Sequence, residues 1–223
     1  VLAPLLEQVL DAALELQLHS GVQRGARVLV GRVDVGGGAG PAEEEVVPAG
    51  RLGHRDGSDE ALAWAKAIRE LTRESGTRFV VNDRFDLALI VEADAVHLGQ
   101  TDLPPSAIPE EVRTQLAIGR STHTPEQLAA THNEPVDYVA FGPVFGTTSK
   151  DSAYGKRGLD ALRQAVDLAA PRPLVAIGGI TADRLDVLRE AGVGGFAVIS
   201  VVATDADPVA AAKNLIRRFR GTP

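Results

Sequence analysis

The chain has no cysteine, no long apolar run and no extended basic segment. Without cysteine it can form neither disulfides nor thiolate metal sites. No apolar run approaches the roughly 20 residues that cross a bilayer, and we expect no secretory signal because the first residues lack its charged and apolar regions. The net charge is −7 and the basic stretch at 217–220 is short, so a nucleic-acid-binding face is not expected. These absences favour a cytoplasmic globular protein without membrane or nucleic-acid partners. A homo-oligomer is compatible with them.

What is present suits one α/β domain. The 223 residues are 44% hydrophobic and 24% charged, which provides a sizeable core and an ordinary polar surface. A single barrel of alternating strands and helices fits this length. We therefore expect one domain over residues 1–223.

From residue 78 onward, short apolar runs alternate with longer amphipathic ones. The short runs are apolar nearly throughout, as strands buried on both faces of a parallel sheet are. They lie at residues 79–81, 95–98, 117–119, 138–141, 174–177 and 196–199. Helices are predicted at residues 58–74, 86–91, 125–131, 159–169, 182–191 and 208–219, and a further one at 5–16. Such alternation predicts right-handed crossovers and a (β/α)8 barrel of the TIM type.

A doubly wound open sheet is the alternative architecture. Its Gly-x-Gly-x-x-Gly signature between a first strand and a helix is absent. The glycine-rich run at 36–40 is followed by Pro41 and three glutamates, which would repel a pyrophosphate. We interpret this run as a flexible loop.

Polar residues follow each predicted strand, where the active sites of such barrels gather. Asp83 and Asp102 come after neighbouring strands, and two carboxylates with water and phosphate oxygens are typical ligands of Mg²⁺. The alternative is structural: Asp83 would cap a helix and Asp102 would form a turn. His97 lies within an apolar strand and is predicted to be a buried, hydrogen-bonded core histidine. His123 has no partner at metal-ligand spacing.

Two further groups at strand ends suit phosphate. Lys150 lies in a loop rich in Thr and Ser and offers a point charge, although a lone loop lysine is commonly just solvated. Gly178–Gly179 and Ile199–Ser200 follow the last two strands, where backbone N–H groups commonly bind phosphate. The glycines also admit a packing explanation.

The motifs at these strand ends resemble those of the thiamine phosphate synthase family. They are Val-Val-Asn-Asp-Arg at 80–84, Ala-Asp-Ala-Val-His-Leu-Gly-Gln-Thr-Asp-Leu-Pro at 93–104, Ile-Gly-Arg-Ser-Thr-His at 118–123, Asp-Tyr at 137–138 with Phe-Gly-Pro-Val-Phe at 141–145, the loop 147–150, Ala-Ile-Gly-Gly-Ile at 176–180 and Val-Ile-Ser at 198–200. The resemblance runs from about residue 59 to the end of the chain, with spacings intact.

The resemblance implies a barrel enzyme that joins hydroxymethylpyrimidine diphosphate to thiazole phosphate with Mg²⁺. Its small phosphorylated substrates and its metal would be held by residues at the strand ends. By likeness, Mg²⁺ would be bound by Asp83 and Asp102, the leaving pyrophosphate by Asn82 and Lys150, phosphate groups by Thr147 and Ser149, the aminopyrimidine by Ser121, and the thiazole phosphate by Gly178, Gly179, Ile199 and Ser200.

The first quarter departs from the family pattern. A clear first strand is missing, and residues 19–57 lack helical or strand periodicity apart from two strand candidates at 27–33 and 45–47. Where the family carries Gln-x-Arg-x-Lys for the diphosphate, this chain has Arg51-Leu52-Gly53-His54-Arg55. An insertion, a degenerate paralogue and a sequence altered over this stretch are the three explanations. We therefore expect an irregular or incomplete first βα quarter.

Two other functions follow from this departure. A thiazole tautomerase, a related barrel, needs no diphosphate substrate, and the missing motif favours it. The retained Asn82, Asp83 and Asp102 favour the synthase, as does Pro143, where the tautomerase pattern prefers histidine. A catalytically impaired paralogue that only binds a phosphorylated ligand is the third alternative.

Overall fold

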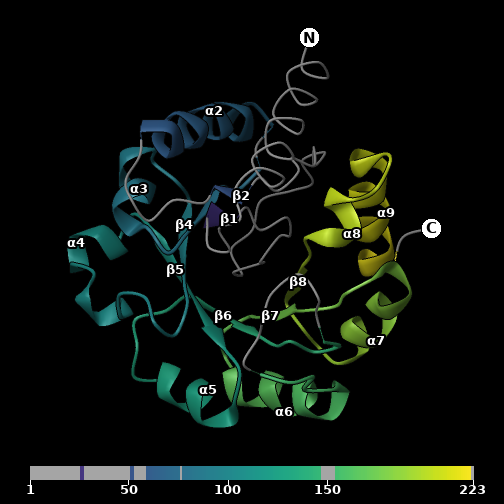
Figure 1. The fold of residues 1–223 in the computed structure, drawn as a ribbon. Helices are drawn as coiled ribbons and strands as arrows, with labels where there is room; N and C mark the ends of the chain where they lie inside the picture. The colour runs from purple at the N-terminus through teal and green to yellow at the C-terminus, as the bar shows by residue number, and fades with distance from the viewer. Residues whose placement is uncertain (1–25, 28–50, 53–58, 76, 147–153, 222–223) are drawn as a thin grey trace.

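A curled sheet of six parallel strands forms the centre of the molecule (Figure 1). The computed structural model describes residues 26–27, 51–52, 59–75, 77–146 and 154–221. Neighbouring strands in the sheet are also neighbours in sequence, as right-handed crossovers through helices produce. They are β3 (Val80–Asn82), β4 (Ala95–Leu98), β5 (Ala117–Thr122), β6 (Tyr138–Phe141), β7 (Leu174–Ile177) and β8 (Gly195–Ala197). All six predicted strands of the barrel are confirmed within one residue at the start and three at the end.

The first two strands do not join this sheet. Among the described residues, β1 (Ala26–Arg27) and β2 (Arg51–Leu52) pair with each other in antiparallel fashion, and β1 lies next to β3. This agrees with the predicted irregular first quarter. The strand candidate at 45–47 and the helix predicted at 5–16 lie outside the described residues, as does most of the candidate at 27–33.

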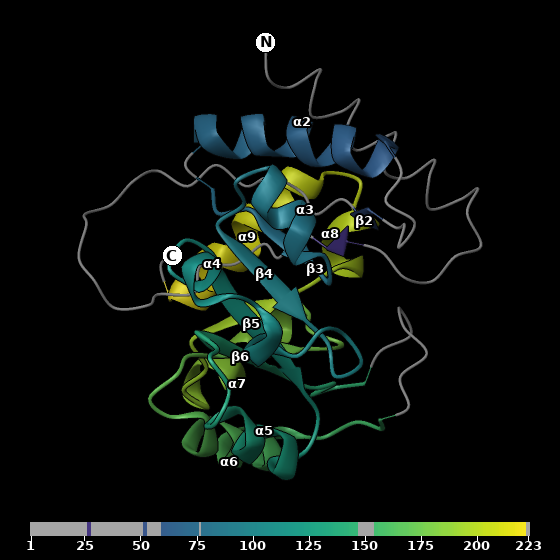
Figure 2. The ribbon, with the colours of Figure 1, turned by 90° about the vertical axis from the view of Figure 1, so that its left-hand side faces the viewer.

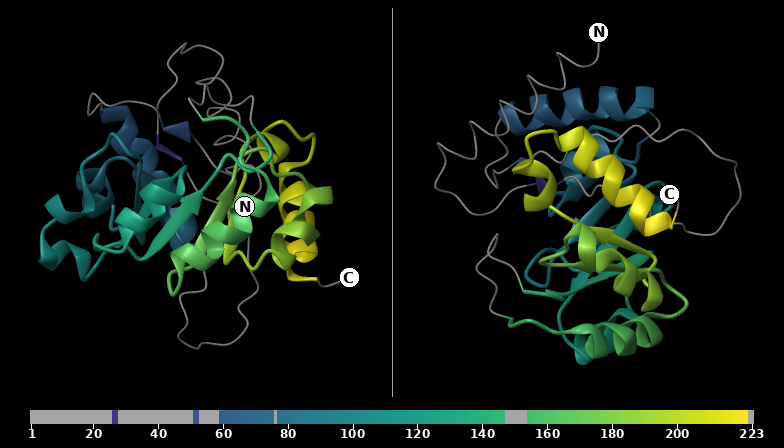
Figure 3. Two further views of the ribbon diagram at one scale, coloured as in Figure 1. Left: turned by 90° about the horizontal axis from the view of Figure 1, so that it is seen from below. Right: turned by 90° about the vertical axis from the view of Figure 1, so that its right-hand side faces the viewer.

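Helices surround the sheet on its outer face (Figures 1 and 2). The longer ones are α2 (Asp59–Ser75), α6 (Leu159–Ala169) and α9 (Pro208–Arg220). Shorter ones are α3 (Phe85–Ile90), α4 (Glu110–Arg113), α5 (Pro125–Thr131), α7 (Leu185–Glu190) and α8 (Ser200–Ala203), with single 3₁₀ turns η1 (Pro105–Ala107) and η2 (Ala182–Arg184). In Figure 3, α9 lies beside α7 and α8, which it contacts.

Local sequence explains where these helices begin, end and face. Ala65, Ile68 and Leu71 of α2 are buried in one stripe, as predicted. The hydroxyl of Thr124 accepts a hydrogen bond from the backbone N–H of Gln127 at the start of α5, before a proline at the first helical position. Gly192, two residues after α7, adopts a left-handed backbone with φ 80° and ends that helix.

The alternation of side chains along the strands separates two apolar layers. The large outer layer fills the space between sheet and helices, and it includes Val96, Ile118 and Phe141. The small inner cluster consists of Tyr138, Ala140 and Val175, with Ile177 and Ala197 packed against it. The polar residues Asn82, His97 and Ser121 share this inner face, because strand residues two apart point to the same side. In the described part of the chain, no helix has the length and apolar character needed to traverse a bilayer.

Candidate active site at the carboxyl ends of the strands

Asn82 and Asp83 end strand β3 in a strained turn. Asp83 has φ 66°, a left-handed conformation that is uncommon for residues with a side chain. Its backbone N–H donates to the carbonyl of His97 on β4 at 2.8 Å, and its Oδ1 accepts from the Asn82 amide at 2.5 Å. Arg84, and not Asp83, occupies the N-cap position of α3. A backbone outlier held in place by neighbouring strands is typical of functional sites.

Asp102 closes a tight turn after strand β4. Its Oδ2 accepts the backbone N–H of Gly99 at 2.7 Å, and a Cβ on Gly99 would lie only 2.9 Å from that oxygen. The turn role predicted as the structural alternative is therefore present. A carboxylate has several acceptor positions, so this turn and a metal ligand role are compatible.

The two aspartates are brought to one end of the same strand pair. Asn82 pairs with His97 in the β3–β4 register, Asp83 is tied to the His97 carbonyl, and Asp102 folds back onto Gly99, two residues beyond. Both aspartates therefore follow neighbouring strands at the same end of the sheet.

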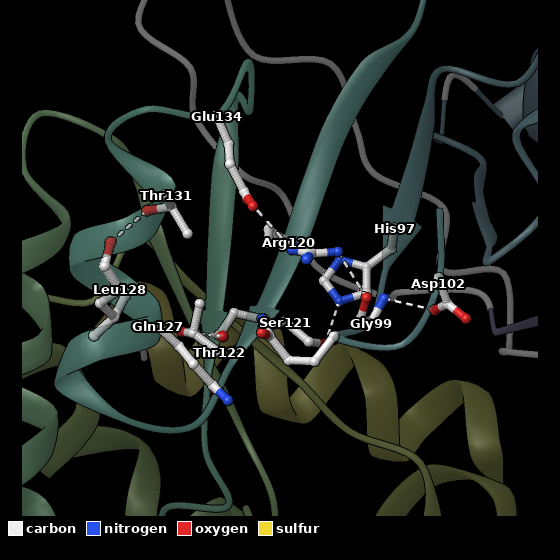
Figure 4. Close-up of polar contacts among 12 residues, drawn as sticks. His97, Gly99, Asp102, Arg120, Ser121, Thr122, Gln127, Leu128, Thr131 and Glu134 are labelled. Carbon is white, nitrogen blue, oxygen red and sulfur yellow. Dashed lines mark hydrogen bonds and ion pairs between the residues drawn. The ribbon is translucent and has the colours of Figure 1, made fainter. Parts of the chain in front are cut away.

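Arg120 supports the Asp102 turn from the outer face of the sheet (Figure 4). It is only 6% exposed, and its Nη1 donates to the carbonyl of Gly99 at 2.7 Å. Its Nε lies 3.4 Å from Oε2 of Glu134, a charge contact without a hydrogen bond. Because a buried guanidinium is stable only when paired, this side chain fixes the turn.

Replacing Arg120 with methionine is expected to lower the free energy of unfolding by about 2–3 kcal/mol. The change leaves the Glu134 carboxylate without its opposite charge and the Gly99 carbonyl without its donor. Urea unfolding measures the change. Arg163→Met, which breaks only the exposed pair with Asp160, is the matched control and should change stability by less than about 0.5 kcal/mol. Equal losses in the two variants would contradict the role given to Arg120.

A polar row crosses the inner face from β4 to β6. His97 is buried, as predicted, and its Nε2 lies 2.8 Å from the Ser121 hydroxyl (Figure 4). Its Nδ1 lies 3.1 Å from the hydroxyl of Tyr138. The Gln100 amide donates to the Ser121 carbonyl at 2.5 Å, which ties the Asp102 turn to β5. Sequence reasoning identified Ser121 and His97 but missed the roles of Tyr138 and Gln100.

A second group of side chains lies after strands β5 and β6. The Nδ1–H of His123 donates to the Gly142 carbonyl oxygen at 2.6 Å, and the His123 ring stacks on Tyr154, with ring centroids 4.2 Å apart. The guanidinium of Arg157 lies 5.1 Å from the centre of the Tyr154 ring. Tyr154 and Arg157 were missed from sequence, where the one available signal was their place in the loop after β6.

Gly178 and Gly179 follow β7 with φ of 90° and 65°. A Cβ on Gly178 would lie 2.5 Å from the Cβ of Pro143, and one on Gly179 would lie 2.1 Å from the carbonyl oxygen of Gly146. The packing requirement that the sequence left as an alternative is thus present, and it brings the loops after β6 and β7 together. The carbonyl of Gly179 also accepts from Arg184 at 2.5 Å.

The remaining predicted site residues differ in what the structure describes. Ile199 and Ser200 lie after β8, where Ser200 begins the four-residue helix α8 and both residues are exposed. Thr147, Ser149 and Lys150 lie outside the described residues, between Gly146 and Tyr154. Within the described ranges, no three His, Asp or Glu side chains are grouped to hold a metal. Asp83 and Asp102 are two carboxylates at the ends of neighbouring strands, and a hard cation that keeps water or phosphate ligands commonly takes one or two protein carboxylates.

The family model for thiamine monophosphate synthase matches residues 52–202. The chain belongs to this family. A thiamine-phosphate synthase of Moorella thermoacetica is 41% identical over 165 residues, which cover 73% of this chain and 78% of the relative. One from Synechococcus sp. strain WH7803 is 39% identical over 211 residues, 94% of this chain. This chain spans only 58% of the Synechococcus protein.

Among solved structures, thiamine phosphate pyrophosphorylase from Pyrococcus furiosus superimposes with a TM-score of 0.67 and 34% identity. The superposition covers 75% of this chain and 80% of the Pyrococcus protein. The fold class predicted from the strand–helix alternation and the family predicted from the strand-end motifs are both confirmed for this member of the thiamine monophosphate synthase family.

Proposed function

We propose that this chain is a Mg²⁺-dependent thiamine phosphate synthase. It would join hydroxymethylpyrimidine diphosphate to thiazole phosphate, releasing thiamine phosphate and pyrophosphate. The observation that carries the proposal is the pair Asp83 and Asp102 at the ends of adjacent strands, with Asp83 in a strained left-handed conformation. The family membership supports the same reaction.

The chemistry requires a leaving group and a nucleophile to be held in line. The bond between the pyrimidine methylene carbon and the diphosphate oxygen breaks, and pyrophosphate departs with the electron pair. The electron-rich aminopyrimidine stabilises the cation that develops on that carbon, and the thiazole ring nitrogen supplies the electron pair of the new C–N bond. This nitrogen carries no hydrogen, so the step needs no general base. Orientation and electrostatic stabilisation would supply the rate enhancement.

The residues predicted for the site would have distinct parts in this reaction. Asp83 and Asp102 would hold Mg²⁺, which when bound would neutralise charge on phosphate oxygens. Asn82 and Lys150 hold the pyrophosphate, and Ser121 contacts the aminopyrimidine. The thiazole phosphate is held by Gly178, Gly179, Ile199 and Ser200, and Thr147 and Ser149 contact phosphate groups.

The missing Gln-x-Arg-x-Lys motif favours a second candidate, a thiazole tautomerase, and a third, a paralogue that only binds phosphorylated ligand. One set of assays separates the three. With both substrates and Mg²⁺, the synthase forms thiamine phosphate and pyrophosphate in equal amounts. Isomerisation of the thiazole phosphate without the diphosphate would favour the tautomerase, and ligand binding without either reaction would favour the paralogue.

A further inference from the structure

Three neighbouring strands place Tyr138, Gly119 and His97 in one row on the inner face. Gly119 pairs with His97 on one side and with Tyr138 on the other. Because Gly119 has no side chain, the Tyr138 ring lies over it: a Cβ there would be 2.1 Å from Cζ of the ring. The ring thereby reaches His97, with centroids 5.6 Å apart and planes inclined by 27°. On the other side of the imidazole lies Ser121, two residues after Gly119 on β5, with its hydroxyl 2.8 Å from His97 Nε2.

The direction of the hydrogen bonds in this row follows from the environment of Tyr138. The residue is 5% exposed, and burial, followed by the charge of Asp137, raises the pKa of its hydroxyl above the ordinary range, so the proton stays on. Among the described residues, the hydrogen-bond partner of this hydroxyl is His97 Nδ1. A buried O–H donor without an acceptor is costly. The hydroxyl therefore donates to Nδ1.

The hydrogen bond from Tyr138 determines which nitrogen of the His97 ring carries the hydrogen. If Nδ1 accepts a hydrogen bond, the hydrogen of the neutral ring is on Nε2. The Nε2–H donates to the Ser121 oxygen, so the hydrogen of Ser121 points away from His97. In the opposite tautomer, Nε2 would take that hydrogen and Ser121 could only accept.

We propose that Tyr138 and His97 are positioning residues that make Ser121 a hydrogen-bond donor toward the substrate. The inference rests on the proposed function and deepens it. Ser121 would select a ring that presents a lone pair, such as an unprotonated pyrimidine nitrogen. Gly119 belongs to the same device, because only glycine leaves space for the tyrosine ring.

Nitrogen-15 NMR of the ligand-free protein tests the tautomer directly. For wild type, we expect the hydrogen on Nε2 of His97 and a bare Nδ1; a hydrogen on Nδ1 would overturn the proposal. In Tyr138→Phe, which keeps the ring over Gly119, the preference for Nε2–H should be lost. Should that variant fail to fold, the wild-type spectrum still decides. This measurement needs no turnover, so it stays informative if the proposed reaction is absent.

Substrate analogues test the consequence. In analogues of the diphosphate substrate, one pyrimidine ring nitrogen at a time is replaced by CH. For wild type, one replacement should raise the KM by about fivefold to tenfold, the worth of one hydrogen bond. That penalty should disappear in Ser121→Ala and shrink in Tyr138→Phe, with the KM for thiazole phosphate unchanged. An equal penalty in all three proteins would overturn the inference while leaving the synthase assignment intact.

Discussion

Replacing Asp102 with asparagine is expected to slow thiamine phosphate formation by about a hundredfold or more while the fold survives. The asparagine keeps an oxygen that can accept the Gly99 N–H, so the turn after β4 is retained. It removes one of the two negative charges that would bind Mg²⁺ in the proposed site. Steady-state assays at saturating Mg²⁺, together with urea unfolding, separate the two effects.

Asp160→Asn is the matched control for this experiment. Asp160 is 94% exposed on α6, and its ion pair among the described residues is with Arg163, three residues later. The change removes the same charge from the protein without touching the strand ends, so the rate should stay within a factor of two. Wild-type activity in the Asp102→Asn variant would contradict a metal-binding role for Asp102, independently of the control.

Replacing Gly119 with alanine is expected to lower the free energy of unfolding by about 2–3 kcal/mol and to reduce activity strongly. The new Cβ would lie 2.1 to 2.5 Å from two ring carbons and the hydroxyl oxygen of the buried Tyr138. The ring is confined by β7 residues of the inner cluster, so it can move only by straining the sheet. Its displacement also breaks the contact with His97.

Gly155→Ala provides the comparison for the glycine experiment. A Cβ on Gly155 meets nothing within 4 Å, so the change should be neutral or stabilise by up to about 1 kcal/mol through the unfolded chain. Thermal unfolding of the two variants measures the difference. If Gly119→Ala were as stable and active as Gly155→Ala, the Tyr138 ring could not lie where the structure has it.

The strands and the rim were predictable because they depend on local patterns. Runs such as 95–98 and 138–141 are apolar nearly throughout, as strands buried on both faces are, and both form strands at those bounds. Polar residues that follow such runs must meet at one end of a parallel sheet. Asp83 and Asp102 accordingly follow neighbouring strands at the same end of the sheet.

The contacts between strands were not predictable in the same way. Arg120 was predicted only as one of the polar residues after the strand at 117–119, yet it lies within β5, is buried and donates to a carbonyl on another loop. The need for glycine at position 119 arises from the ring of Tyr138, nineteen residues later, which the register of β5 with β6 places beside it. Local sequence patterns do not specify which residues of two strands lie side by side. The left-handed backbone of Asp83 likewise depends on its bond to β4.

The first quarter was predicted only as a departure from the pattern. Its sequence lacks the periodicity that would place a strand, and the described pieces Ala26–Arg27 and Arg51–Leu52 pair with each other and not with the parallel sheet. The family's diphosphate-binding motif, Gln-x-Arg-x-Lys, would fall in this region and is absent from it. The proposed reaction therefore depends on what the rim can bind without it.

Calorimetric titration with pyrophosphate is the most direct test of the proposed metal–pyrophosphate site. With Mg²⁺ present, the wild-type protein should bind pyrophosphate, and binding should vanish in EDTA and in the Asp83→Asn, Asp102→Asn double variant; asparagine tolerates the left-handed backbone at residue 83. Binding that is equally strong without Mg²⁺, or unchanged in the double variant, would contradict a metal–pyrophosphate site between β3 and β4.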